Sequence, residues 1–150
     1  MSERQKAYTV KPPRISEHQE QVNFLLEVRT RYGLREDFIE TLLFATPNGM
    51  WAGGSSREGK FALIGKMKKE GFKNGVSDLL YLQPRGDYAY LAIEMKATDK
   101  RDDAKAVSPE QAAFLAAVNE AGGTGEVCYG CDEAVAIFTW YMSLPVKSIL

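Results

Sequence analysis

Long apolar runs, histidine and cysteine are all scarce or missing in this sequence. No apolar stretch approaches the roughly 20 residues that cross a bilayer, and the polar start of the chain lacks the apolar centre of a signal peptide. These absences favour a cytosolic protein. A chain of 150 residues, with 45% hydrophobic and 26% charged residues, is long enough to bury one ordinary core.

The few cysteines limit the metal chemistry that the chain supports. Cys128 and Cys131 have the Cys-x-x-Cys spacing of a zinc half-site or a redox pair. A structural zinc site normally shows a second Cys or His pair, but the single histidine, His18, is far away in the sequence. We therefore expect no zinc. The alternative is that Cys128 is a small apolar residue in a buried strand and that Cys131 follows in the next turn.

A strong excess of basic residues is also missing, because the net charge is -1. Proteins that bind nucleic acids more often carry a marked positive charge, so the overall charge does not indicate such a partner. Basic residues do gather locally, with only Glu58 and Glu70 as acids among them: Arg57, Lys60, Lys66, Lys68, Lys69 and Lys73. This segment is either a basic binding face or a solvated helix surface.

Turn signals and apolar periodicity predict an α/β domain. Residues 1–14 show no periodic apolar pattern and indicate a flexible N-terminal arm, followed by a single domain over residues 15–150. The predicted order of elements is α-β-α-β-β-α-β-α. Its helices cover residues 16–32, 57–70, 109–121 and 132–142, and its strands cover residues 41–46, 78–82, 88–96 and 126–129.

One predicted strand carries an acid and a lysine on the same face. Because side chains alternate with a period of two, Glu94 and Lys96 point the same way. A hairpin folded at Arg85 and Gly86 brings Asp78 alongside Glu94 or close to it. Two carboxylates hold a divalent cation, and a lysine positions or activates the attacking water, so this set suits the cleavage of phosphodiesters.

Alone, the pattern Glu-x-Lys is a weak signal, because an acid and a lysine two residues apart form an ordinary pair on many strands. Its context makes it more specific. Ile93 and Met95 are expected to be buried on the opposite face, and Gly75 closely precedes Asp78. A polar helix start, with a cap, a proline and a glutamine, follows at residues 108–111.

Further motifs stand in a fixed order around this set. They are Glu17-His18-Gln19-Glu20-Gln21, Pro47-Asn48-Gly49, the segment 70–78, Ile93-Glu94-Met95-Lys96, Ser108-Pro109-Glu110-Gln111, and residues 127–130 followed by Asp132-Glu133-Ala134. With these motifs, residues 16 to 142 resemble the virus-type replication-repair nuclease domain, VRR-NUC, of the PD-(D/E)xK superfamily. The resemblance implies a restriction-endonuclease-like α/β/α fold, in which a central mixed sheet is flanked by helices and the metal lies at the open edge of the hairpin.

The resemblance also implies roles for individual residues. Asp78 and Glu94 would bind Mg2+ or Mn2+, together with the main-chain carbonyl of Met95. Lys96 would serve the nucleophilic water, and Gln111 would support the site from the third predicted helix. The activity implied is a metal-dependent endonuclease that hydrolyses DNA phosphodiester bonds.

The same resemblance places an acid of the first helix near the metal. Glu17 fits the family's spacing to Gln21 and is preferred here, with Glu20 as an adjacent rival. The chain departs from the family where proline is usual and Asn74 and Ser77 stand instead. Ligand chemistry does not depend on those prolines, but we expect a looser turn in their absence.

The expected partner is DNA. Asn48 is a candidate contact near the metal, although Pro-Asn-Gly also suits any tight turn, and Lys66, Lys69 and Lys73 would belong to the basic face. Stand-alone domains of this family, common in phages and prophages, look suited to branched or junction DNA. So small a domain is expected to need two copies to engage two strands, as a homodimer.

Two alternatives stay open at this stage. The fold could serve a module that binds nucleic acid without cutting it, although the complete set of Asp78, Glu94 and Lys96 argues against this. The metal centre could also act on another phosphoester, because it does not itself choose DNA over RNA or a nucleotide.

Overall fold

The computed structural model describes residues 13–33, 38–47 and 56–147, so most of the expected N-terminal arm lies outside the described residues. The elements follow the predicted order with two short additions, α2 and η2. They are α1 (Glu17–Tyr32), α2 (Ile39–Leu42), β1 (Leu43–Ala45), α3 (Arg57–Lys69), β2 (Leu79–Tyr81), β3 (Leu91–Lys96), the 3-10 helix η2 (Thr98–Lys100), α4 (Pro109–Glu120), β4 (Thr124–Tyr129) and α5 (Cys131–Ser143). No described helix is both long and apolar enough to cross a membrane.

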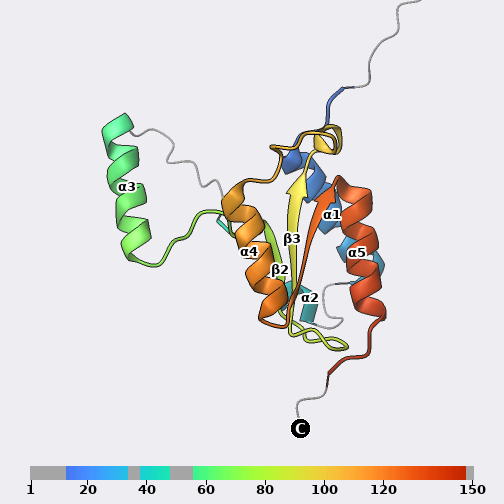
Figure 1. The fold of residues 1–150 in the computed structure, drawn as a ribbon. Coiled ribbons are helices and arrows are strands. Elements are labelled where there is room, and N and C mark those ends of the chain that lie inside the picture. The colour runs from blue at the N-terminus through green and yellow to red at the C-terminus, as the bar shows by residue number, and fades with distance from the viewer. Residues whose placement is uncertain (1–12, 34–37, 48–55, 148–150) are drawn as a thin grey trace, which may run out of the picture.

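The strands form one mixed sheet in the order β1-β2-β3-β4 (Figure 1). The first three strands are antiparallel neighbours, whereas β3 and β4 run parallel. Helices α1 and α5 pack together on one face of the sheet, and α4 covers the other face. This arrangement confirms the expected α/β/α fold with a central mixed sheet.

The core lies between the sheet and the pair of helices α1 and α5. Phe138 of α5 is at its centre, with ring centroids 5.8 Å from Phe24 and 5.2 Å from Tyr81. Residues Ile93 and Met95 of β3 face this core and are buried, as predicted. Because α4 covers the opposite face, every residue of β3 is buried, including the polar ones.

The first strand is shorter than the sequence predicts. A strand over residues 41–46 is wrong for Thr41 and Leu42, which belong to the short helix α2, and for Thr46, which follows β1. The apolar run is divided because Ile39 turns into the core on α2 while Leu43 enters it on β1. An apolar run of this length does not distinguish a helical turn from a strand.

The hairpin is confirmed, but its second strand begins at Leu91 instead of residue 88. The longer connection is held by Arg85, whose guanidinium donates hydrogen bonds to the carbonyls of Met142 and Leu144 at 2.6 and 2.8 Å. Since these carbonyls lie at the end of α5, the cation also compensates the partial negative charge there. The connection is therefore fixed to the helix as well as to the sheet.

A long excursion of the chain separates β1 from β2, and its two ends are tied together. The Thr46 N–H donates to the Asp78 carbonyl at 2.9 Å, and the Thr46 hydroxyl donates to the Ser77 carbonyl at 2.7 Å. Helix α3 lies within this excursion and stands apart from the sheet in Figure 1. None of its residues is buried.

Glu20 of α1 connects three elements near the end of the sheet. Its carboxylate accepts a hydrogen bond from the Thr98 hydroxyl at 3.1 Å and another from the Cys131 N–H at 2.8 Å. The Cys131 N–H belongs to the first turn of α5, which has no side-chain cap of its own. Glu20 therefore caps a helix that is remote in the sequence.

Replacing Glu20 should destabilise the fold, because it removes both bonds to a buried carboxylate. We predict that Glu20→Ala lowers the free energy of unfolding by about 2–3 kcal/mol in chemical denaturation. Glu17→Ala is the matched control, one turn earlier on the same helix, and should change that free energy by less than about 0.5 kcal/mol. Equal losses in the two variants would contradict the capping role.

Candidate active site

Strand pairing brings the two predicted acids together. Leu79 of β2 pairs with Ile93 of β3, so the antiparallel register continued by one residue sets Asp78 opposite Glu94. Both side chains then lie on the face that α4 covers, because neighbours across an antiparallel pair share a face. The acids stand at the ends of the two middle strands of the sheet, at the open end of the hairpin away from its turn.

Lys96 completes the predicted set through an ion pair. Its Nζ donates to Glu94 Oε1 at 2.9 Å, and both side chains are at least nine-tenths buried. Gln111, in the first turn of α4, donates from Nε2 to the same carboxylate oxygen and accepts from Lys96 Nζ at 3.3 Å. The acid, the base and the amide therefore form one connected cluster.

The start of α4 orients the Gln111 amide. Ser108 and Gln111 form a reciprocal capping box, in which each side chain bonds the other's main-chain N–H. Consequently Gln111 Oε1 accepts from both the Ser108 N–H and Lys96. The residues that predicted a helix start from the sequence are thus the ones that direct an amide into the cluster.

Burial leaves the Glu94 carboxylate poorly compensated. Its second oxygen, Oε2, is buried and accepts no hydrogen bond from the described residues. Desolvation raises the pKa of Glu94 to about 7, the Lys96 hydrogen bond opposes that rise and the charge of Asp78 adds to it. A buried acceptor without a donor is costly, and a cation can satisfy it.

Asp78 is also held in place and electrostatically perturbed. Its Oδ2 accepts a hydrogen bond from the Met95 N–H at 2.8 Å. Desolvation raises the pKa of Asp78, while the Met95 N–H and the charge of Lys96 lower it. In a strand the N–H and the carbonyl of one residue point to the same side, so the Met95 carbonyl is on the Asp78 side of β3.

Gly75 fixes the loop that leads into Asp78. Its φ is +79°, and a Cβ at this position would lie 2.6 Å from the carbonyl carbon of Glu110. Only glycine tolerates both the backbone conformation and the close approach. The turn expected to be loose is therefore docked on α4 beside Gln111. The Asn74-Gly75 dipeptide is a turn signal, but nothing in the sequence indicates its partner.

The structure separates the two candidate acids of the first helix. Glu20 is buried, and its carboxylate already accepts hydrogen bonds from the Thr98 hydroxyl and from the first turn of α5. Glu17 is exposed at the start of α1, and its charge contributes to the raised pKa values of Asp78 and Glu94. Glu17 is thus the acid of this helix that is available to the cluster.

The predicted DNA contacts are not gathered at the acid cluster. Lys66 and Lys69 are exposed on α3, and Lys73 is exposed on the loop between α3 and Asp78. Lys66 lies 3.8 Å from Glu70, a solvated pair of little strength. Asn48 lies outside the described residues.

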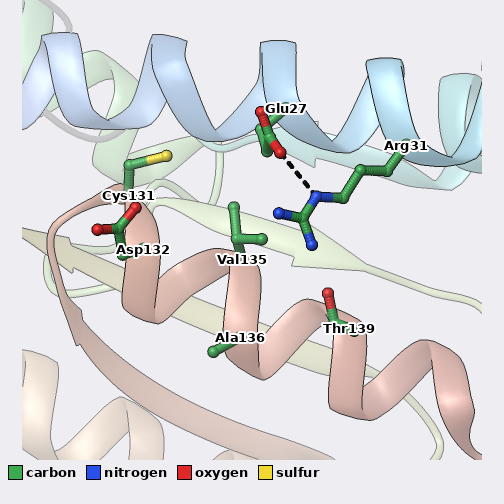
Figure 2. Close-up of a pocket in the computed structure, with 7 residues that line it drawn as sticks. All are labelled: Glu27, Arg31, Cys131, Asp132, Val135, Ala136 and Thr139. Atoms are coloured by element: carbon green, nitrogen blue, oxygen red, sulfur yellow. Dashed lines mark hydrogen bonds and ion pairs between the residues drawn. The ribbon is translucent and has the colours of Figure 1, made fainter.

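The cysteines take structural positions. Cys128 is fully buried in β4, where desolvation raises the pKa of its thiol to about 12, so it behaves as an apolar residue. Cys131 begins α5 and does not lie in a turn as expected. It borders a cavity of about 600 Å3 between α1 and α5, beside the ion pair of Glu27 and Arg31 (Figure 2). Of the predicted site residues that the structure describes, none lines that cavity.

Comparisons with known proteins give a family and a similar fold. The family model described as "VRR-NUC domain" matches residues 55–132, which include Asp78, Glu94, Lys96 and Gln111. The chain belongs to the VRR-NUC domain family. A solved structure titled "VRR_NUC domain protein" is similar in fold, with a TM-score of 0.70 and 20% sequence identity over 91% of this chain and 95% of that one. No curated protein sequence matches.

Membership of the VRR-NUC family makes this chain a nuclease domain, and its cluster can be tested for a fit to a divalent metal. Among the described residues, no three His, Cys, Asp or Glu side chains form a ready-made metal site. Mg2+, however, is commonly held by one or two carboxylates with water completing its shell. Asp78, the free Oε2 of Glu94 and the carbonyl of Met95 match that donor set in chemistry.

The raised pKa of Glu94 predicts how the stability of the metal-free VRR-NUC domain depends on pH. In the unfolded chain this carboxyl ionises near 4.5, whereas in the folded protein it keeps its proton up to about pH 7. Its contribution to stability is complete below pH 4.5 and is lost as the pH rises to about 7. The raised pKa of Asp78 acts in the same direction.

Glu94→Gln should remove this contribution, because the amide cannot ionise. In the presence of a chelator, we predict that the variant gains stability relative to the native chain between pH 4.5 and 7, by up to about 3 kcal/mol. Urea denaturation at a series of pH values measures the difference. A difference that does not vary with pH would contradict the raised pKa.

Proposed function

We propose that this VRR-NUC domain is a Mg2+- or Mn2+-dependent endonuclease that cleaves DNA, with a preference for branched or junction structures. The observation that carries the proposal is the convergence of Asp78, Glu94 and Lys96 at the ends of β2 and β3. Glu94 Oε2 is buried beside Asp78 without a donor from the described residues, and this supports a cation at the site.

Asp78, Glu94 and the Met95 carbonyl would hold the metal, and Glu17 would approach it from α1. When bound, a divalent metal polarises the scissile phosphate and lowers the pKa of a bound water. Lys96 would orient the attacking water and offset negative charge that develops on the phosphate. Gln111 keeps Lys96 and Glu94 in their relative positions through its two hydrogen bonds.

The basic segment supports a polymeric substrate over a small phosphoester. Lys66, Lys69 and Lys73 are exposed along α3 and the loop that leads to Asp78. A nucleotide-sized substrate would not reach along such a segment, whereas a DNA strand has a phosphate at every step. The lysines would therefore position the DNA without reading its sequence.

Helix α3 also supports the expected homodimer. At 100° per residue, Phe61, Leu63, Ile64 and Met67 fall within one 160° arc of the helix, which also carries Arg57, Lys60 and Lys68, and Lys66 and Lys69 fall on the other side. Phe61 is 65% exposed and Ile64 is 41% exposed. A helix of 13 residues with no buried side chain is marginal alone. A second copy of the chain would cover these exposed apolar side chains by a two-fold contact, with Lys66 and Lys69 left free for DNA.

The nuclease proposal predicts cleavage that depends on both metal and site. The native chain should cut a labelled panel of linear, flapped and four-way-junction DNA with Mg2+ or Mn2+, and a chelator should abolish cutting. Lys96→Ala and Asp78→Asn should each reduce the rate by at least about 100-fold, because they remove the water-positioning group or a ligand.

Lys105→Ala serves as the charge-matched control for Lys96→Ala, since Lys105 is exposed and lies outside the cluster. Thermal denaturation gives a readout besides activity: Mg2+ should raise the melting temperature of the native chain and not that of Asp78→Asn. If the native chain binds every DNA in the panel and cuts none, the domain is a binding module instead.

The dimer proposal predicts different effects for two aspartates placed on opposite sides of α3. Ile64→Asp replaces an apolar side chain of the proposed contact with a charge and should make the protein monomeric, whereas Ala62→Asp adds the same charge on the other side and should leave the dimer intact. Light scattering coupled to size-exclusion chromatography measures the mass. A native chain that is monomeric both alone and with junction DNA would refute the dimer.

A further inference from the structure

A second recess brings two cations together at the end of the strand that carries Glu94 and Lys96. A cavity of about 370 Å3 is lined by Arg14, Ser16, Glu17, Ala97 and Lys100. Ala97 directly follows Lys96 at the end of β3, and Lys100 ends the short helix η2. The cavity thus lies between the start of α1 and the segment that leaves the catalytic strand.

Glu17 connects this cavity with the acid cluster. It lines the cavity, and its charge acts on the carboxyls of Asp78 and Glu94. Ala97 of the lining also directly follows Lys96 of the cluster, so a group bound in the cavity would lie near whatever is bound at the acids. For a polynucleotide, the neighbour of the reacting phosphate is the next phosphate along the same strand.

The two cations of the cavity keep unused hydrogen-bond donors. Arg14 is bonded through Nε to Asp99 at 2.7 Å, and Lys100 through Nζ to Asp103 at 3.1 Å. The outer N–H groups of the guanidinium make no bond to the described residues, and an ammonium has three donors. Both pairs are exposed to solvent, so a competing anion displaces or joins them at little cost.

We propose that this cavity binds the internal phosphodiester next to the scissile one, with Arg14 and Lys100 as its contacts. A phosphodiester carries one negative charge and two free oxygens, which match an arginine and a lysine that converge from two elements. The first N–H groups of α1 add a favourable dipole at the same end of the cavity. This inference rests on the proposed function, because it assumes that a DNA strand reaches the acids.

The test compares Arg14, which precedes α1, with Arg31 of α1 itself, because both are exposed arginines that pair with an acid. Arg31 lies at the far end of α1 and is paired with Glu27 at 2.7 Å, as Arg14 is with Asp99 at the same distance. Binding of an unphosphorylated, labelled single-stranded oligonucleotide is measured by fluorescence anisotropy with a chelator present and at several salt concentrations. The proteins are the native chain, Arg14→Ala, Lys100→Ala and Arg31→Ala.

Arg14→Ala and Lys100→Ala should each weaken binding by about five- to tenfold at low salt and reduce the slope of log affinity against log salt by about 0.7, the value for one contact to a single strand. Arg31→Ala should behave like the native chain. Equal losses for Arg14→Ala and Arg31→Ala would overturn the proposal, because they would indicate a general effect of charge.

The same phosphate chemistry could come from a strand end. An oligonucleotide with a 5′-phosphate and inorganic phosphate as a competitor separate the two sources. If Lys100→Ala affects only the phosphorylated strand, the cavity holds a terminal phosphate and the proposal is wrong. If the native chain cuts DNA with Mg2+ but Arg14→Ala and Lys100→Ala bind and cut normally, this inference fails and the nuclease proposal stands. If nothing cuts DNA, the nuclease proposal fails.

Discussion

The ion pair between Lys96 and Glu94 lies almost completely inside the protein, at the end of a strand that helices cover on both faces. A charge in such a place must be met by neighbouring groups, because water does not reach it. The nearby structure supplies them: Gln111 binds both partners, the capping box with Ser108 orients Gln111, and Gly75 lets the loop of Asp78 close over the same helix turn. One carboxylate oxygen is still left without a donor among the described residues, and it is where the proposed metal would bind.

Much of this arrangement could be predicted because the signals are local. The period of two along β3 places Glu94 and Lys96 on one face, and the hairpin brings Asp78 back to them. Ser108, Pro109 and Gln111 fix the start of α4 within one turn, which places the amide without knowledge of the rest of the chain. The order of motifs along the chain then identified the family before any contact was known.

The remaining features depend on contacts between distant residues, which leave no periodic signal. Glu17 and Glu20 are equivalent in sequence, and only the packing of α1 against Thr98 and α5 separates them. The end of α2 and the start of β1 share one apolar run, so their boundary follows from what each side chain packs against. The cavity beside Glu17 joins residues that are far apart in the sequence, and no local pattern connects Arg14 with Lys100.

The two hydrogen bonds of Thr46 make the segment between β1 and β2 a modular unit. The chain leaves the sheet at Thr46 and returns at Ser77 and Asp78, and these residues are bonded to each other. The segment between these residues is a loop whose ends are bonded together. Its length changes the free energy of unfolding only weakly, because the entropic cost of closing a loop grows slowly with length. Insertions, deletions or a replacement of α3 are therefore tolerated without disturbing β2. Evolution can thus change the exposed basic residues of this segment while Asp78 stays in place beside Glu94.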